Sequence, residues 1–592
     1  MAHQSEDCHR LLKAENTVLT LEGLRKVSHT SLPGVFFFHL PSGRTDEDAA
    51  NSQNAFGALS EFVSELHNES TICILTTPAD AARLLPNLEF ILKFQLWISI
   101  KLEEGVYAPR PNFLPQRHAA LLIFTRYKGG LRHTLTRVAY TYCPACNKTT
   151  KDYGGKKHIY NPYGTLLSDV WRDIACDPRE TVPTITDRLR DLFGIQPYTK
   201  LCIVDLRFCR ELKPTRHEEE IKEDSLPFKW DSKRTPPNSR LINDDCLVAL
   251  RGMAEASLDF CFADPPYNIQ KQYDHWNDAL ESRHYFDWCD QWLSELGRIL
   301  KPGRTLAVIN IPLWAVRHYQ FLCSTLKFQS WICWDGLSFP VRKIMPANYA
   351  IICFSKGEPR ELPGLNKHFI STLEHKQMLP QKEFFCIRSS CVAERRANGS
   401  YDRHEMDDLW TDIHRLKHNS RRVDHPCQLP PILMRRLFSL FTIPGETILD
   451  CFNGAGTSTL VAQQMGRRSI GIELSPKYHA IATARHETLA DGADPFGKND
   501  NAPGAKNSRV ERLPKQKYVV SKKILQLEVR HIAQRIGHVP NRDEVKSLSK
   551  YPIEYFDKYF ISWGEVCAAA RHSGMSEQRC KPIEEPLQPV LF

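Results

Sequence analysis

The stretch "ETILDCFNGAGTSTLVAQQMGRRSIGIEL", residues 446–474, places a glycine-rich turn between apolar segments of two different periods. Its two ends are short apolar runs typical of buried strands, and residues 458–465 carry apolar side chains at helical spacing. Gly454 and Gly456 allow a tight turn and a close approach of the backbone to a ligand. The order strand, loop, helix, strand predicts an α/β sheet with helices on both faces.

A carboxylate stands at the end of the second strand of this unit. Glu473 lies about as far from the loop as the acid that grips ribose hydroxyls in nucleoside-binding βαβ units. The glycine loop alone is a weak signal, because many such loops are only turns, and a dinucleotide site is the obvious rival. The spacing "GAGT" differs, however, from that of a pyrophosphate-binding loop.

A second motif lies upstream, in "FCFADPPYNIQ", residues 260–270. There a strand-like apolar run stops at Asp264-Pro265-Pro266-Tyr267. Prolines end strands in many proteins, so this motif alone would also be weak. Together, the two motifs resemble those of the DNA amino-methyltransferases that use S-adenosylmethionine (AdoMet). The resemblance spans residues 241–486, and the order of its motifs is that of the β class.

This resemblance implies roles for individual residues. Asp264 and the carbonyl of Pro265 accept the two hydrogens of an exocyclic amino group, Pro266 stiffens the turn, and Tyr267 stacks on the target base. The cofactor-binding positions are Asp245, Asp450, Phe452, Gly454, Gly456, Thr457 and Glu473, with Asp245 near the adenine and Glu473 on the ribose. One position departs from the family motif: Leu429 in "HPCQLP" stands where a lysine is usual, and we assign it no role.

The chemistry explains why a strand would end in this way. An aromatic amine is a poor nucleophile, because its lone pair is delocalised into the ring. Two fixed acceptors pull the nitrogen toward tetrahedral geometry and stabilise the positive charge that forms on it. In the family, an acid at the first position of the motif favours adenine N6 over cytosine N4. Adenine is therefore the prediction and cytosine the first alternative. A non-catalytic DNA-binding scaffold and an RNA or protein-amide methyltransferase are further rivals.

Length and composition restrict the protein class only loosely. The chain of 592 residues is long enough for two to four domains, and its net charge of +9 is compatible with contact to nucleic acid. Its 19 cysteines are scattered through apolar segments, which is typical of reduced intracellular thiols. The chain has neither a signal peptide nor a long apolar run, so we expect a cytoplasmic protein, nucleoid-associated if bacterial, without membrane association.

The N-terminal part echoes the central one. Four segments match in collinear order, beginning at positions 94 and 328, 114 and 345, 168 and 407, and 189 and 437. The first copy lacks the catalytic motif, because Leu40 aligns with Asp264 and Gly43 with Tyr267, and no glycine loop follows Asp205. We expect a degenerate copy that neither binds AdoMet nor catalyses. It would make the chain a monomer with an internal pseudo-dimer.

Two polar linkers divide the chain. The predicted parts are a degenerate methyltransferase-like pseudo-subunit at 1–210, a linker at 211–239, a catalytic domain at 240–490 with a variable target-recognition region at about 360–405, a linker at 491–517 and a helical DNA-binding module at 518–592. The last part resembles the short repeats associated with homing endonucleases. The predicted fold is thus a Rossmann-like AdoMet-dependent methyltransferase sheet in two copies plus a small all-α module.

Some residues outside these motifs are candidates for metal or DNA. Cys143 and Cys146 in "YCPACNK" have zinc-ligand spacing, and either Cys386 with Cys391 or His158 with Cys176 would complete a site. Ordinary reduced loop cysteines are the alternative. Arg388, Arg395 and Arg396 in the variable region are candidate DNA contacts, with a solvated basic loop as the alternative. DNA is the expected partner, and a cognate restriction nuclease or defence protein would be a second one.

Overall fold

The structure of the chain is a computed structural model. It describes residues 18–19, 34–40, 56–206, 239–496 and 520–571, the longer ranges with short internal gaps, among which are 151–160, 337–343 and 381–388. The chain divides into two compact units, residues 1–505 and 506–592. The predicted boundary at 210–240 does not separate two such units, because both halves of the first unit share one hydrophobic core.

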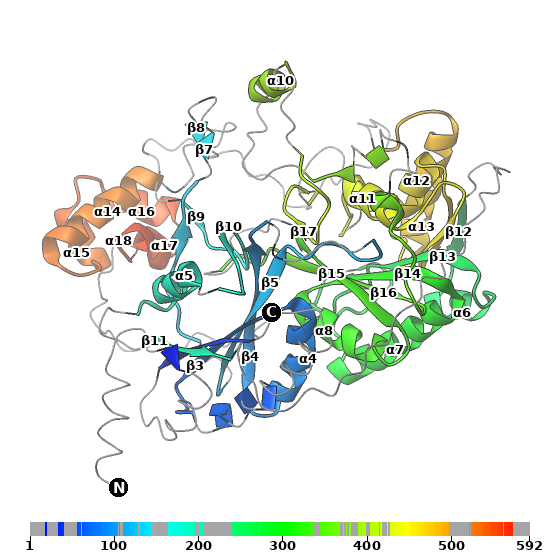
Figure 1. The fold of residues 1–592 in the computed structure, drawn as a ribbon. Helices are drawn as coiled ribbons and strands as arrows, with labels where there is room; N and C mark the ends of the chain where they lie inside the picture. The colour runs from blue at the N-terminus through cyan, green and yellow to red at the C-terminus, as the bar shows by residue number, and fades with distance from the viewer. Residues whose placement is uncertain are drawn as a thin grey trace, which may run out of the picture. The chain divides into compact units, whose positions relative to one another are not determined.

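The central part of the first unit is built on an eight-stranded sheet (Figure 1). In spatial order its strands are β12 (Ser239–Asn243), β19 (Arg468–Glu473), β18 (Thr447–Asp450), β13 (Leu258–Ala263), β14 (Leu300–Asn310), β16 (Asn348–Ser355), β15 (Lys327–Asp335) and β17 (Leu409–Trp410). The first five are mutually parallel, β16 is antiparallel to both neighbours, and β17 is parallel to β15. Because β13 and β18 are parallel neighbours, the two sequence motifs at their carboxyl ends meet at one edge of the sheet.

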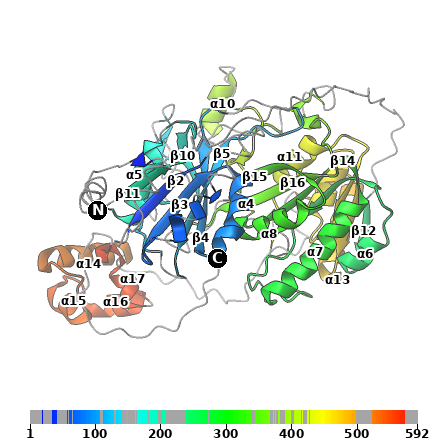
Figure 2. The ribbon, with the colours of Figure 1, turned by 60° about the horizontal axis from the view of Figure 1, so that its bottom comes forward.

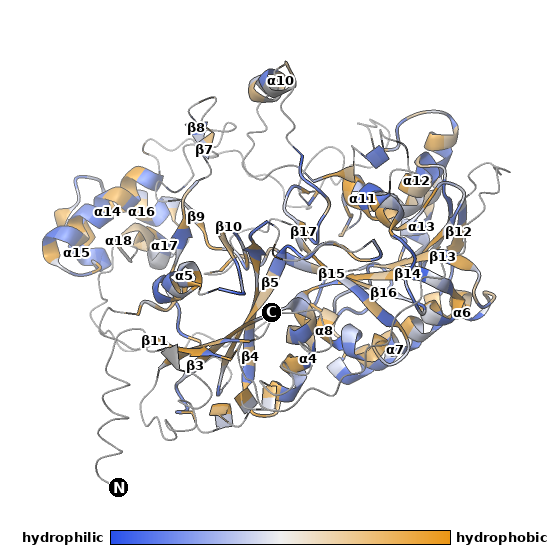
Figure 3. Cartoon of the chain, viewed as in Figure 1, coloured by the Kyte–Doolittle hydropathy of each residue, from blue (hydrophilic) through white to orange (hydrophobic). Residues whose placement is uncertain are grey.

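Helices cover this sheet as the apolar periodicity predicts. They are α6 (Cys246–Arg251), α7 (Ser282–Ile299), α8 (Pro312–Leu322), α11 (Pro431–Phe441), α12 (Thr457–Gln464) and α13 (Pro476–Ala490). The buried residues of α7 recur every three or four positions, from Tyr285 through Trp292 to Ile299. In Figure 3 the strands are mainly hydrophobic, whereas α7 carries both hydrophobic and hydrophilic positions. The strand–helix–strand unit predicted around the glycine loop is confirmed as β18, α12 and β19.

The N-terminal part carries a seven-stranded sheet. In spatial order its strands are β1 (Val18–Leu19), β11 (Leu201–Asp205), β2 (Val35–His39), β3 (Thr71–Thr76), β5 (His118–Thr125), β4 (Lys93–Leu102) and β10 (Val170–Cys176), and its helices are α4 (Pro78–Glu89) and α5 (Pro183–Phe193). Two small hairpin-like pairs, β6 (Arg137–Val138) with β9 (Thr165–Leu166) and β7 (Tyr142–Cys143) with β8 (Lys148–Thr149), lie outside this sheet.

The two sheets share one strand pattern. From β10 through β4, β5, β3 and β2 to β11, strand order and direction repeat those from β17 through β15, β16, β14 and β13 to β18. Even the irregularities match, because the pairing shifts by one residue between Phe94 and Leu96 in β4 and between Phe328 and Ser330 in β15. In the N-terminal sheet β1 pairs directly with β11, at the place that β19 occupies beside β18.

The strand registers correct one detail of the sequence comparison. Phe36 of β2 and Cys261 of β13 occupy equivalent places in the two sheets. Three residues further along stand His39 and Asp264, so the counterpart of Asp264 is His39 and not Leu40. The error of one position arose because apolar strand residues align equally well in neighbouring registers. No carboxylate stands at this place in either alignment.

The two halves pack through equivalent residues. Trp97 of β4 and Trp331 of β15 stack with ring centroids 4.8 Å apart and an interplanar angle of 6°. Helices α4 and α8 pack against each other and lie side by side in both views (Figure 1, Figure 2). Asp169 Oδ1 accepts hydrogen bonds from the backbone of Ala347 at 2.7 Å, and Asp408 Oδ1 accepts one from the backbone of Arg117, also at 2.7 Å.

The second unit is helical in its described part. Its helices are α14 (Lys522–Ile536), α15 (Arg542–Leu548), α16 (Ile553–Tyr559), α17 (Trp563–Val566) and α18 (Ala568–Arg571), and the described residues form no strand. A reciprocal capping box between Asn541 and Glu544 starts α15. Leu525, Val529 and Phe556 are among the residues that form its own core. Nowhere in the described part of the chain is a helix long and apolar enough to cross a membrane.

Candidate active site

One cavity gathers both sequence motifs at the carboxyl edge of the central sheet. Its lining includes all four predicted catalytic residues, Asp264, Pro265, Pro266 and Tyr267, and six of the cofactor positions, Asp245, Asp450, Phe452, Gly454, Thr457 and Glu473. Gly456 does not line it. That glycine instead begins α12 with a φ of +78°, and a Cβ there would lie 2.9 Å from the Cβ of Ala482.

The Asp-Pro-Pro-Tyr turn is fixed from outside the cavity. Tyr285 Oη donates to the Pro266 carbonyl at 2.8 Å, and Trp314 Nε1 donates to the Tyr267 carbonyl at 2.8 Å. Among the residues that the structure describes, none donates a hydrogen bond to the Pro265 carbonyl. After the turn the chain is held by Asp278, whose carboxylate accepts from three backbone amides at 2.7 to 3.0 Å.

Asp264 sits in an environment that makes its charge costly. Burial, with a smaller contribution from the nearby Asp450, raises the pKa of this carboxyl to about 7, while the Tyr267 hydroxyl, which donates to Asp264 Oδ1 at 2.9 Å, opposes the shift. Lys271 and Arg415 also oppose it through their positive charges. A partly desolvated carboxylate that titrates near neutral pH is typical of a catalytic acceptor.

Aromatic side chains form the wall beside this acid. The ring centroids of Tyr267 and Tyr349 are 6.3 Å apart, and that of Trp334 lies 5.1 Å from Tyr349. Arg415 donates to the Tyr349 hydroxyl at 2.6 Å and covers its ring at 5.3 Å. All four side chains line the cavity. The wall therefore offers several aromatic faces beside the Arg415 cation, which suits a planar heterocycle.

Lys271 places a positive charge in the region where this sequence departs from the family motif. Leu429 lines the cavity without a charge, but Lys271 Nζ lies 3.0 Å from Cys427 Sγ and 5.4 Å from the ring centroid of Tyr267. Lys271 comes from the loop after the catalytic turn and was not predicted from sequence. The cavity thus keeps a positive charge near Tyr267 although position 429 is apolar.

The glycine loop is organised around Glu473. One carboxylate oxygen accepts from the backbone of Gly454 at 2.8 Å, and the other accepts from the backbone of Ser475 at 2.8 Å. Burial raises the pKa of this carboxyl. Gly454 has a φ of +51°, and a Cβ at this position would stand 2.8 Å from His425 Nε2. The left-handed backbone conformation and the nearby His425 side chain therefore both favour glycine here.

Two further predicted acids have structural partners of their own. Asp450 is 4% exposed, accepts from the backbone of Phe452 at 2.9 Å and from the hydroxyl of Ser458, and burial raises its pKa to about 6. Asp245 caps the N-terminus of α6 by accepting from the backbone of Leu247 at 2.9 Å. Both residues also line the cavity.

The predicted metal and DNA residues lie elsewhere. Cys143 and Cys146 come together with Cys391, but not with Cys176, which is buried in the N-terminal core. Cys386, His158 and Arg388 lie outside the described residues, and Arg395 and Arg396 are on α10 (Ser389–Ala397), where their side chains are not described.

Sequence reasoning missed the supports of the site. They are Lys271, Asp278, Tyr285, Trp314, Tyr349, Arg415 and Ser458. Most come from segments without a motif, and only the tertiary fold brings them to the turn. Ser458 carried a readable signal, since it is the second residue of α12, the helix that begins directly after the loop.

The comparisons with known proteins fall on this central segment. Residues 258–484 match the family model described as DNA methylase. The type II methyltransferase M.BamHI of Bacillus amyloliquefaciens is 30% identical over 244 residues, which make up 40% of this chain and about half, 54%, of that protein. The DNA adenine methyltransferase YhdJ of Escherichia coli (strain K12) is 25% identical over 252 residues, 41% of this chain and 81% of that protein.

Among solved structures, the PvuII DNA methyltransferase, described as cytosine-N4-specific, is 19% identical and covers 43% of this chain and 92% of its own, with a TM-score of 0.31. The M1.HpyAVI–SAM complex is 14% identical and covers 42% and 98%, with a TM-score of 0.30. TM-scores this low support no conclusion about this chain. The family match over residues 258–484 instead spans both sequence motifs, which meet in the one cavity, so this central segment is similar to the DNA methylases.

Proposed function

We propose that the protein is an AdoMet-dependent DNA methyltransferase that modifies the N6 amino group of adenine. The observation that carries this proposal is the meeting of the Asp-Pro-Pro-Tyr turn and the glycine loop in one cavity. A carboxylate that titrates near pH 7 faces the same space as a glycine loop held by Glu473. Neither feature alone would distinguish a methyltransferase from a turn or a nucleotide site.

The residues present fit AdoMet. The carboxylate of Glu473 is anchored by two backbone amides beside the loop, in the place of an acid that binds ribose hydroxyls. Gly454 leaves room at the loop that any side chain would fill. Asp450, Phe452 and Thr457 line the same end of the cavity, and Asp245 lines it near α6. When bound, AdoMet would supply an electrophilic methyl group carried on a sulfonium.

The chain's own contribution is to make a weak nucleophile reactive. Asp264 would accept one hydrogen of the exocyclic amine, and the Pro265 carbonyl, fixed by its proline ring, would accept the other. Both acceptors stabilise the positive charge that grows on the amine nitrogen during transfer. The surplus proton then passes from that nitrogen to Asp264, whose pKa of about 7 suits a group that must bind and release a proton near neutral pH.

The aromatic wall would hold the target base. A base inside a duplex cannot reach a carboxylate at the bottom of a cavity, so it has to be rotated out of the stack. Tyr267 and Tyr349 offer faces for the extruded base, and Trp334 closes the wall behind them. Lys271 and Arg415 at this wall would attract the flanking phosphates.

The choice of adenine rests on two supports. The first position of the catalytic motif is an acid, which in the resembling family favours adenine. The relative YhdJ is named as a DNA adenine methyltransferase. Cytosine N4 carries a chemically similar amine, and the same two acceptors would serve it.

We further infer that residues 1–210 are a degenerate copy of the catalytic part and act as a resident pseudo-subunit. The repeated strand order, the matching irregularities and the stacked Trp97–Trp331 pair support this inference. Residues 518–592 would bind DNA as a separate helical module. The partners would be DNA and, for a restriction-modification role, a cognate nuclease, and the place of action would be the cytoplasm.

The main proposal is tested on the purified full chain with duplex DNA and AdoMet labelled in its methyl group. Digestion to nucleosides and mass spectrometry should give labelled N6-methyladenine, and the Asp264→Ala variant should give none. Label in N4-methylcytosine instead would show that cytosine is the methylated base, and the proposed mechanism would still apply. Label in RNA or protein, with none in DNA, would contradict the proposal.

The pseudo-subunit is tested by stoichiometry. Calorimetric titration of the full chain should give one AdoMet per chain. Residues 240–490 expressed alone should aggregate or form homodimers, because the face that the first half covers becomes exposed. Two cofactors per chain, or a monomeric fragment with full activity, would show that the first half has another role.

A further inference from the structure

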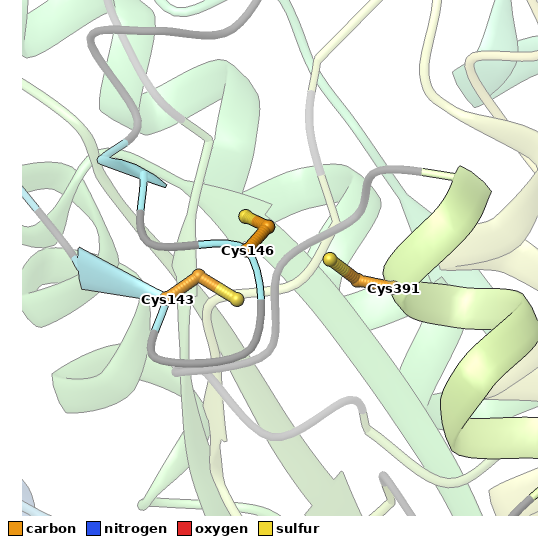
Figure 4. Close-up of side chains that lie close together, drawn as sticks. All are labelled: Cys143, Cys146 and Cys391. Carbon is orange, nitrogen blue, oxygen red and sulfur yellow. The ribbon is translucent and has the colours of Figure 1, made fainter.

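Three cysteines from two distant segments meet outside the catalytic cavity. Cys143 ends β7, Cys146 follows it in the turn toward β8, and Cys391 lies on α10 (Figure 4). Their sulfur atoms all lie within 4.8 Å of one another. Cys143 and Cys391 are 5% and 2% exposed, and Cys146 is half-buried.

Apolar packing does not explain this cluster. The three cysteines form a group of their own, separate from the cores under the two sheets. By contrast, Cys73 and Cys261 sit inside buried strands, where burial raises their thiol pKa and keeps them protonated. A thiol in such a core acts as a small apolar residue. Three thiols that face one another between short loop elements have no such role.

The geometry fits a metal ligand set. Cys143 and Cys146 have the spacing of a chelating pair, and β7 pairs with β8 so that Cys143 stands opposite Lys148 in a two-stranded hairpin. Zinc–sulfur bonds of about 2.3 Å in a tetrahedron place two sulfurs about 3.8 Å apart. The observed separations allow this with small side-chain rotations. Thiolate donors select zinc among the abundant divalent ions.

We propose that Cys143, Cys146 and Cys391 bind a structural zinc ion. The ion joins a hairpin of the N-terminal half to α10, the helix in the variable region that carries Arg395 and Arg396.

The site has a consequence for the two halves. β7 belongs to the half that lacks the catalytic motif, whereas α10 belongs to the half that has it. A shared metal therefore holds the variable region against the pseudo-subunit. This consequence for DNA rests on the proposed function, but zinc binding itself does not.

The experiment measures zinc in the full chain. Protein purified without chelator, or refolded with ZnCl₂, should contain about one zinc per chain by elemental analysis. Cys143→Ser and Cys391→Ser should each reduce the content well below one. Cys323→Ser, which changes an exposed cysteine at the end of α8, should leave it unchanged. Far-ultraviolet circular dichroism of each variant separates loss of a ligand from loss of the fold.

A second measurement on the unmodified chain covers the case in which the variants fail to fold. Alkylation followed by peptide mass spectrometry should leave Cys143, Cys146 and Cys391 unreacted until a chelator is added. Co²⁺ in place of zinc should give the absorption of a tetrahedral thiolate site. Absence of bound zinc, alkylation of all three residues without chelator, or a Cys143–Cys146 disulfide in metal-replete protein would overturn the proposal. Failure of DNA methylation would leave this result untouched.

Discussion

The ionisation of Asp264 predicts a pH dependence of catalysis. Only the carboxylate can take up the proton that the methylated amine releases, so the protonated form is inactive. Burial raises the pKa of this group to about 7 in the free protein. With that pKa the ionised fraction rises from about one eleventh at pH 6 to about ten elevenths at pH 8, and kcat/KM for AdoMet should rise about tenfold over this interval.

The same shift makes an opposite prediction for stability. The ordinary pKa of an aspartate is 3.8, well below the folded-state value. Between about pH 4 and about pH 7 the folded state holds a proton that the unfolded state has lost, so this carboxyl lowers stability as the pH rises. The Asp264→Asn variant removes the charge and keeps the shape. It should lose methyl transfer yet melt at a higher temperature than the unmodified protein at pH 8.

Steady-state transfer at DNA concentrations well below saturation, measured at intervals from pH 5.5 to 9, tests this reasoning, with AdoMet affinity measured at each pH as the control. The bound sulfonium is cationic and lowers the pKa, so kcat itself should titrate at a lower pH than kcat/KM. A flat kcat/KM between pH 6 and 8, or Asp264→Asn protein with an unchanged rate, would refute the assignment of Asp264 as the proton acceptor.

Other predictions test single parts of the structure. Tyr267→Phe keeps the ring and removes only the hydrogen bond to the catalytic acid, so transfer should fall less than with Tyr267→Ala, which also loses base stacking worth about 1–3 kcal/mol; equal losses in single-turnover rates would contradict base stacking. Gly454→Ala should weaken AdoMet binding in calorimetry, because its Cβ meets His425, whereas unchanged affinity would remove the glycine loop from the cofactor site. Truncation before Tyr518 should weaken DNA binding and reduce its salt dependence with AdoMet affinity unchanged, and an unaltered salt slope would make the tail a structural cap.

The sequence predicted those parts of the fold whose determinants are local. The β18–α12–β19 unit follows from apolar period and two glycines, and the structure confirms it. The supports of the catalytic turn could not be predicted in this way. Tyr285 and Trp314 lie on helices whose apolar faces look like any other, and only the packing of α7 and α8 brings them to the turn.

The N-terminal half shows the limit of sequence comparison. The sequence similarity between the two halves located equivalent strands, because their buried β-strands contain similar apolar residues. It placed the counterpart of Asp264 at Leu40 instead of His39, since neighbouring registers of an apolar strand score alike. The contacts that Asp169 and Asp408 make between the two halves carry no motif and appeared only in the structure.

The most direct test of the central claim is a nucleoside analysis of cellular DNA. Cells free of other DNA methyltransferases would carry either the unmodified gene, the Asp264→Ala gene or an empty vector. We expect N6-methyladenine only with the unmodified gene, confined to one sequence context by sequencing that detects modified bases. N6-methyladenine of equal amount in cells with the Asp264→Ala gene, or no modified base in cells that express soluble unmodified protein, would contradict the assignment.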